Sequence, residues 1–217
     1  MDKQKSSYII AIIALIFAVG AISIGFSAFS NVLEIKTSAN VSPSAASFNV
    51  DFSSSSSAVE TNSIVPTKTP STIEATNATI DNTSAPTISN LSATFTGPGQ
   101  KAVYEFYAYN AGEYKAFLNN ITYGNVAGET SFKKCTASVG TTDALVQTAC
   151  NSIVVKVKVG TESEVTGSQA SITNHSLDKK TAEKVTVTIE YLPTENQADG
   201  DFTVDFGDIT LGYSTID

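Results

Sequence analysis

The ten residues KAVYEFYAYN at positions 101–110 determine which fold class the sequence predicts. Successive side chains of an extended segment point to opposite faces of a sheet, so residues two positions apart share a face. One face would carry Val103, Glu105, Tyr107 and Tyr109, and the other Tyr104, Phe106 and Ala108. These aromatic residues could form a binding platform, but we favour core packing on one face and cross-strand contacts on the other. A strand over residues 103–109 is therefore predicted.

Turn-forming residues bound this strand on both sides. Gly97-Pro98-Gly99 precedes it and Asn110-Ala111-Gly112 follows it, and both compositions are typical of tight turns. A second strand is predicted over residues 114–123, immediately after the second turn.

The same alternation of apolar and polar residues recurs along the rest of the chain. It predicts further strands over residues 48–52, 75–80, 87–91, 153–159, 185–192 and 202–213. Asp199-Gly200 favours a reverse turn, so we expect the last two strands to pair as an antiparallel hairpin. Helical spacing occurs only over residues 142–149. Many short strands without alternating helices predict an all-β fold, a jelly-roll-like two-sheet antiparallel sandwich.

Composition and charge exclude several classes of function. The chain has 217 residues, of which 13 are basic and 21 acidic, and its net charge is −8. All the basic residues are Lys, so neither a basic surface nor the arginine fork that reads guanine is available, and we expect no nucleic-acid partner. One His and two Cys exclude zinc sites built only from those residues.

The first 27 residues predict an apolar helix that serves as a signal peptide or a membrane anchor. Lys3 and Lys5 precede an apolar run over residues 8–28, which is long enough for either role. Gly25 and Ser27 place small residues at the positions required for cleavage before Ala28. In either case we expect the following residues to lie outside the cytoplasm, in an extracellular or cell-surface location. Contact with the membrane is expected only through this segment.

Two further regions follow the leader. Residues 28–45 form a connector, in which Phe29, Leu33 and Ile35 have the same parity, as they would in a single extended strand. Residues 46–217 form the predicted sandwich domain. Its Ser/Thr-rich part, residues 53–90, could be disordered, but we expect short strands joined by irregular loops there.

The two cysteines are predicted to pair. Cys135 and Cys150 lie in an exported chain, where thiols tend to oxidise and an even number favours a disulfide. In the chain-entropy description a loop of this size stabilises the fold by about 3 kcal/mol. The spacing is not C-x-x-C, so we expect no redox-active role.

Candidate catalytic and metal-binding residues are few. His175 lies in a polar stretch with no second His, and we predict no catalytic residue, metal or cofactor. The best alternative is a calcium site, since calcium takes clustered carboxylates. Its candidates are Asp199, Asp201, Asp205 and Asp208, for which we favour turn and strand roles. N-x-S/T triplets begin at Asn40, Asn77, Asn82, Asn90, Asn120 and Asn174, and matter only in a host that glycosylates such sites.

Two stretches resemble the TasA and camelysin family of secreted fibre-forming proteins. The leader followed by residues 28–31 (AFSN) looks like that family's export region, which a dedicated SipW-type signal peptidase processes. Residues 90–91, 97–100, 104–112 and 118–124 are similar to its central pattern, a turn leading into an aromatic strand that ends in Asn and Gly. A second strand that closes with a Tyr follows in both.

The resemblance implies a jelly-roll subunit that polymerises into extracellular fibres of a biofilm matrix. In that scheme the freed N-terminal segment of one subunit fills a vacant strand position in the next. Residues 28–37 would be the donor, with Phe29, Leu33 and Ile35 as anchors. Strand addition supplies backbone hydrogen bonds and side-chain pockets, and a head-to-tail contact that does not close gives filaments. The implied partners are further copies of the chain and the signal peptidase.

Two other functions stay open at this point. The chain could be a membrane-anchored, monomeric surface domain that binds a protein or a glycan. It could also be a camelysin-like endopeptidase, an activity that the resemblance brings with it, although the sequence has no recognisable metal motif. We predict that the protein is not an enzyme.

Overall fold

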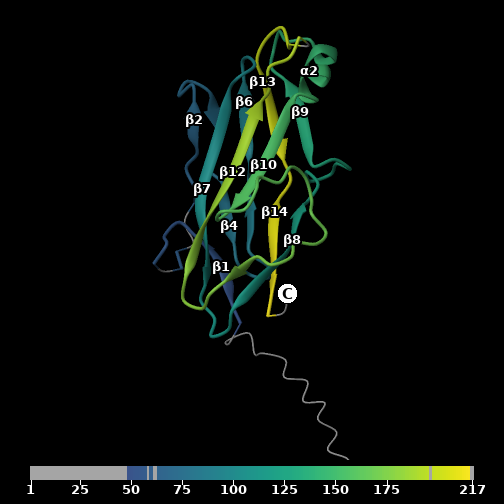
Figure 1. Cartoon of the computed structure of the whole chain (residues 1–217). Coiled ribbons are helices and arrows are strands. Elements are labelled where there is room, and N and C mark those ends of the chain that lie inside the picture. Colours follow the sequence, from purple (N-terminus) through teal and green to yellow (C-terminus); the bar gives the residue numbers. More distant parts are fainter. Residues whose placement is uncertain (1–47, 58, 61–62, 196, 216–217) are drawn as a thin grey trace, which may run out of the picture. The chain divides into compact units, whose positions relative to one another are not determined.

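The computed structural model describes residues 48–57, 59–60, 63–195 and 197–215 (Figure 1). The predicted leader helix, the cleavage site at Ser27 and Ala28, and the donor residues Phe29, Leu33 and Ile35 all lie outside the described residues. No helix in the described ranges is long and apolar enough to cross a membrane.

The described residues form an all-β, jelly-roll-like antiparallel sandwich, as predicted. One sheet, the β7 sheet, has the order β1-β7-β12-β10, and β2 also pairs with β7. Its strands are β1 (Val50–Ser53), β2 (Thr67–Thr69), β7 (Lys101–Asn110), β10 (Ile153–Val159) and β12 (Ala182–Tyr191).

Two smaller sheets form the opposite layer. The β8 sheet has the order β11-β8-β14-β5-β4, with strands β4 (Thr79–Asp81), β5 (Thr87–Ser89), β8 (Ala116–Tyr123), β11 (Ser176–Leu177) and β14 (Ile209–Ser214). The β13 sheet has the order β3-β6-β13-β9, with strands β3 (Glu74–Ala75), β6 (Ser92–Phe95), β9 (Lys133–Ala137) and β13 (Phe202–Phe206). Helix α2 (Asp143–Cys150) lies where the sequence predicted helical spacing.

The two smaller sheets are consecutive parts of the same four chain passes. Each pass contributes one strand to the β8 sheet and one to the β13 sheet, as β5 and β6 do. Between β5 and β6, Asn90 adopts a positive φ of 60°, which an extended strand does not allow. Between β13 and β14, a Cβ at Gly207 would overlap the carbonyl oxygen of Gly124. These two local features divide the layer.

The core lies between the layers and uses the alternation of β7. Tyr104 and Phe106 are fully buried, whereas Glu105 on the other face is exposed. The Phe106 ring packs edge-on against Phe52 of β1 at a centroid distance of 4.7 Å. The Tyr104 hydroxyl donates a hydrogen bond to the carbonyl oxygen of Thr76. The aromatic residues of this face are therefore packing residues.

The prediction that the two strands flanking Asp199-Gly200 pair as a hairpin is wrong. Strand β12 pairs with β7 and β10, whereas β13 pairs with β6 and β9, so the chain crosses from one layer to the other at this turn. The Asp199 carboxylate accepts hydrogen bonds from the backbone N–H and the hydroxyl of Thr142, at 2.8 and 2.6 Å. These hydrogen bonds attach the turn to the start of α2, and β13 continues into the opposite layer between β6 and β9. The predicted strand 202–213 is also divided, into β13 and β14.

The Ser/Thr-rich region forms four short strands, β2 to β5, joined by loops, as expected. The strand predicted over residues 75–80 is interrupted. The chain pairs with β6 up to Ala75 and with β5 from Thr79 onwards.

Candidate functional site

An antiparallel sandwich has two lateral margins, where the outer strands of its layers leave backbone groups open to solvent or to another chain. We define the β1–β4 margin as the side where the β1 edge meets the β4 edge, and the β8–β10 margin as the side where β8 faces β10. A fibre subunit that accepts a strand requires one such margin to be available.

The chain itself closes the β1–β4 margin. The side-chain amide of Asn82, just after β4, accepts a hydrogen bond from the backbone N–H of Phe52 at 2.7 Å. It also donates one to the carbonyl oxygen of Phe52 at 2.9 Å. Asn82 thus replaces the backbone of a neighbouring strand along this part of β1. Ile64 and Ala78 exchange backbone hydrogen bonds of 2.8 and 2.9 Å beside it.

A segment that we call the strap, residues 160–175, covers the β8–β10 margin. It makes isolated bridges to both edge strands and no continuous ladder with either. Its backbone bonds to the edge of β8 and to β10 join Val165 with Val157, Gln169 with Ile121, Ile172 with Asn119 and His175 with Leu118, at N···O distances between 2.6 and 3.0 Å. The Ser168 hydroxyl also accepts a hydrogen bond from the backbone N–H of Tyr123 at 2.8 Å. The strap therefore bridges the two layers, since Val157 belongs to β10 and Ile121 to β8.

An apolar cavity remains beneath the strap. Its volume is about 210 Å³. The apolar residues that line it are Leu118, Ile121, Val157, Val159, Val165 and Ile172. Four polar residues of the strap, Glu162, Ser163, Gln169 and Ser171, also line this hollow, which is partly open to solvent, so the strap covers the margin incompletely.

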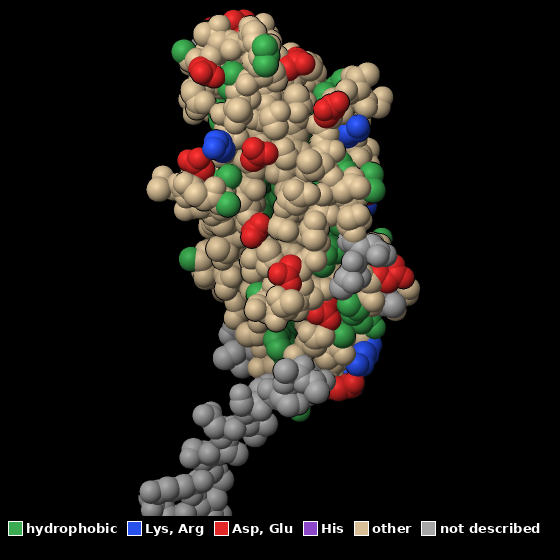
Figure 2. All heavy atoms as spheres, turned by 180° about the vertical axis from the view of Figure 1, so that it is seen from behind, with side chains coloured by type: hydrophobic (Ala, Val, Ile, Leu, Met, Phe, Trp, Pro, Cys, Tyr) green, Lys and Arg blue, Asp and Glu red, His purple; other side chains and the backbone are tan. Residues whose placement is uncertain are grey.

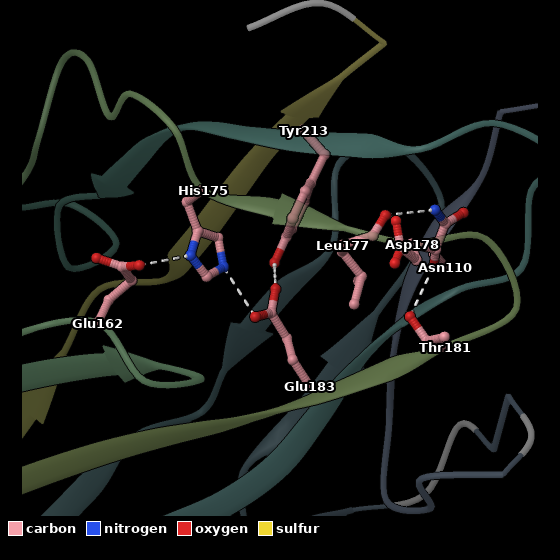
Figure 3. Close-up of polar contacts among 8 residues, drawn as sticks. All are labelled: Asn110, Glu162, His175, Leu177, Asp178, Thr181, Glu183 and Tyr213. Carbon is pink, nitrogen blue, oxygen red and sulfur yellow. Dashed lines mark hydrogen bonds and ion pairs between the residues drawn. The ribbon is translucent and has the colours of Figure 1, made fainter.

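A histidine between two carboxylates attaches the strap to the sandwich (Figure 3). The Nδ1 atom of His175 lies 3.0 Å from a carboxylate oxygen of Glu162, which belongs to the strap. Its Nε2 atom lies 2.8 Å from a carboxylate oxygen of Glu183, which belongs to β12. The Tyr213 hydroxyl, from β14, donates to the second oxygen of Glu183 at 3.0 Å. These contacts connect both ends of the strap to both layers.

His175 and Glu183 are shielded from solvent, whereas Glu162 is half exposed, and the electrostatics of the cluster favour a charged imidazole. The side chain of His175 is 8 % exposed and that of Glu183 is 12 % exposed. The hydrogen bond to Glu183 raises the pKa of His175 to about 9; burial opposes this rise and Glu162 adds to it. At neutral pH both ring nitrogens therefore carry protons and donate to the carboxylates. Burial and the Glu183 charge together raise the pKa of Tyr213.

The start of the strap depends on Gly160. Its φ of +54° lies in the left-handed region, and a Cβ at this position would lie 2.8 Å from the Glu183 carboxylate. A side chain there would disturb the contact that fixes His175.

Sequence reasoning missed the His175 cluster. It placed His175 in a polar stretch between strands, whereas the residue is buried. Its partners lie 13 and 8 residues away along the chain, and only the folding of the strap onto β12 brings them together. The sequence contains no local spacing that could have identified them. Asn82, noted only as a possible glycosylation site, was missed as a margin-closing residue for the same reason.

The predicted disulfide is present at the far end of β10. Cys135 of β9 is bonded to Cys150 at the end of α2, with a Cα–Cα distance of 6.1 Å. Beside it the Lys133 ammonium donates to the carbonyl oxygens of Cys150 and Ile153, at 2.6 and 2.7 Å. Burial lowers the pKa of Lys133. This lysine occupies a backbone acceptor at the start of β10, and the disulfide is compatible with an oxidising, extracellular environment.

The four aspartates of the alternative calcium site have separate structural contacts. Asp199 binds Thr142, as described above, and Asp205 lies opposite Lys134 in the β13–β9 ladder. Asp201 and Asp208 contribute backbone carbonyls to hydrogen bonds within the fold. In the described part of the chain, no group of three or more His, Cys, Asp or Glu residues could hold a metal ion.

The polar surface of the molecule is largely uncharged on one side. The side of the molecule seen in Figure 2 carries scattered acidic side chains, a few lysines and much uncharged polar surface. Hydroxyl pairs between strands, such as Thr94 with Thr203 and Thr87 with Thr210, each at 2.9 Å, form part of the polar exterior.

Comparison with known proteins identifies no relative. Neither the family models, nor the curated proteins, nor the solved structures give a match to this chain.

Proposed function

We propose that this protein is a secreted structural subunit that polymerises into extracellular fibres of a surface or biofilm matrix. In this proposal, residues 28–37 of one copy enter the β8–β10 margin of the next. The observation that carries the proposal is the apolar cavity of about 210 Å³ beneath the strap, located between two strand edges. The resemblance of residues 28–31, 90–91, 97–100, 104–112 and 118–124 to a fibre-forming family supports it further.

The chemistry of the donor segment fits that of the margin. Phe29, Leu33 and Ile35 share one parity, so an extended segment would direct all three side chains to the same side. The cavity lining beneath the strap is largely aliphatic and would bury such side chains. Once the strap is displaced, the backbone groups of β8 and β10 that it occupies would pair with the segment, as in strand addition.

The proposal requires the strap to move. Val157 and Ile121 already bond to the strap, so an entering strand has to displace Val165 and Gln169 from them. The entering strand would replace these bonds with its own backbone hydrogen bonds and bury its apolar side chains in addition. Contact of one copy's N-terminus with another copy's margin does not close on itself, and so produces filaments.

The proposed function requires that the chain is exported and released from the membrane. We infer that a signal peptidase releases the chain between Ser27 and Ala28, since a segment held in the membrane cannot be donated. The principal partner is then another copy of this protein. Neither nucleic acid nor a cofactor has a part in this function, and membrane contact is confined to the leader.

The test uses two matched substitutions in the mature chain that begins at Ala28. Leu33→Asp places a charge on the donor face, whereas Val32→Asp places the same charge on the opposite face. Negative-stain microscopy should show filaments for the unmodified chain and for Val32→Asp, and none for Leu33→Asp or for a chain lacking residues 28–37. Filaments from the chain lacking residues 28–37 would contradict the proposal.

A second function is favoured by one observation, the closure of the β1–β4 margin by Asn82 and Ile64. A domain whose edges are covered by its own chain is suited to act as a monomer. We therefore keep, as the alternative, a membrane-anchored surface domain that binds a protein or a glycan. N-terminal sequencing of the exported protein separates the two: a start at Ala28 favours the fibre subunit, and an intact Met1 favours the anchored domain.

A further inference from the structure

Within the part of the chain that the structure describes, the ion pairs of the strap centre on His175, and one of them joins its two ends. Glu162 lies near the beginning of the strap and His175 at its end, and the two side chains contact each other at 3.0 Å. Glu183 of β12 holds His175 from the other side at 2.8 Å, as Figure 3 shows. Between these ends the strap is held by the backbone bonds of Val165, Gln169 and Ile172 described above.

We propose that the strap is a latch: protonated His175, held between Glu162 and Glu183, keeps the β8–β10 margin closed, and loss of that proton releases the strap. The latch itself follows from the described residues alone. Its consequence, that an open strap admits the N-terminal segment of a second copy, rests on the proposed function.

The release follows from the hydrogen-bonding capacity of imidazole. A protonated ring donates from both nitrogens, and a neutral ring donates from only one. After deprotonation one of the two carboxylates therefore faces a lone pair at about 3 Å, where it previously accepted a hydrogen bond. Glu183 would then be a negative charge in a largely buried site without a positive partner, which is unfavourable, while the half-exposed Glu162 can turn to solvent.

The groups that act on His175 come from three elements. Glu162 faces it from the strap and Glu183 from β12, and these are the carboxylates that affect its pKa. Tyr213 of β14 is one contact further away, bonded to Glu183. The pKa of its hydroxyl is raised, so this group stays neutral through the range in which His175 titrates.

Opening the strap would expose what a second strand needs. The backbone groups of Val157 that pair with Val165, and those of Ile121 that pair with Gln169, would become free. The aliphatic lining of the cavity would also lose its cover. The closed latch therefore protects a secreted monomer from premature pairing at this margin.

The first experiment follows the proton. His175 is the single histidine of the chain, so one imidazole signal reports it without assignment. We expect a nuclear magnetic resonance titration of the exported protein to give a midpoint near pH 9. Glu162→Gln should move this midpoint towards the ordinary value of about 6.5. Glu105→Gln removes one carboxylate from the exposed pair with Lys184 and should leave the midpoint unchanged. If Glu162→Gln leaves the midpoint where it lies in the unmodified protein, the latch is wrong.

The second experiment follows the strap. Hydrogen exchange at pH 7 should show peptides from residues 160–175 losing protection by roughly tenfold or more in His175→Gln, while peptides from β7 keep theirs. If that variant does not fold, Glu162→Gln provides the same comparison. Equal loss of protection in β7, or an unchanged strap, contradicts the latch.

Fibre assembly separates the latch from the proposed function. If the variants open the strap and filaments form faster, both are supported. If the strap opens and no filaments form under any condition, the latch stands and the proposed function is wrong. If filaments form at an unchanged rate, strap opening does not control assembly and the latch has no part in it.

Discussion

The charged state of His175 makes a quantitative prediction about the pH dependence of stability. The folded-state pKa of His175 is about 9, against 6.5 for an unperturbed histidine. Between these two values the folded chain binds more protons than the unfolded chain, so stability falls as the pH rises. The contribution is fully present below pH 6.5 and absent above pH 9.

The magnitude follows from this difference in pKa. Each unit corresponds to 1.36 kcal/mol, so a difference of roughly 2.5 units amounts to about 3 kcal/mol. The histidine is largely buried, so solvent screening removes little of this energy. Burial raises the pKa values of Tyr104 and Tyr123 to about 12. Their contributions to the free energy of unfolding are therefore lost only above pH 10, outside the range from pH 6.5 to pH 9 in which His175 acts.

Urea unfolding followed by far-ultraviolet circular dichroism measures the effect, because the chain contains no Trp for fluorescence. We expect the free energy of unfolding to fall by about 3 kcal/mol from pH 6 to pH 9.5 in the unmodified protein. The fall should also appear in Glu105→Gln and should be absent in His175→Gln. Stability that is constant within about 0.5 kcal/mol, or an equal fall in His175→Gln, would refute the reasoning.

Two further predictions concern the closed margin and the disulfide. Asn82→Ala removes two hydrogen bonds to Phe52 and should lower the unfolding free energy by about 1–3 kcal/mol. Asn77→Ala at an exposed site should change it little, and equal effects would show that Asn82 does not close the margin. Replacing Cys135 and Cys150 together by Ser should cost about 3 kcal/mol. An unchanged melting temperature would mean that the disulfide contributes no net stability.

The strands that sequence reasoning identified best are those whose pattern is local. Val155, Val157 and Val159 alternate with polar residues, and all three are buried in β10. Val185 and Val187 of β12 are buried in the same way. Period-2 burial requires only that one face of a strand meets the core, so neighbouring residues suffice to reveal it.

Strand pairing was predicted less well because it depends on contacts far apart in the chain. Asp199-Gly200 has the composition of a hairpin turn, but the Asp199 carboxylate binds Thr142, 57 residues away. That contact and the packing of the layers place β13 beside β6 and β9. Turn composition predicts that the chain changes direction, and it does not determine which strand becomes the neighbour.

One part of the candidate site could be predicted from the sequence and another part could not. The pairing of Cys135 with Cys150 could be predicted, because two cysteines in an exported chain have a single possible partner each. The His175 cluster could not, since its other members, Glu162, Glu183 and Tyr213, come from the strap, β12 and β14. The donor residues and the cleavage site lie outside the described residues and stay predictions.

The central claim is that the N-terminal segment of one copy occupies the β8–β10 margin of another. The most direct measurement replaces Phe29 by the photoreactive p-benzoylphenylalanine in the mature chain and irradiates assembled filaments made from mixed light and heavy-isotope copies. Mass spectrometry should then find crosslinks between copies, from position 29 to peptides covering residues 118–121 or 157–172. Filaments whose crosslinks fall instead on the β1–β4 margin or on the outer faces of the sheets would contradict the account.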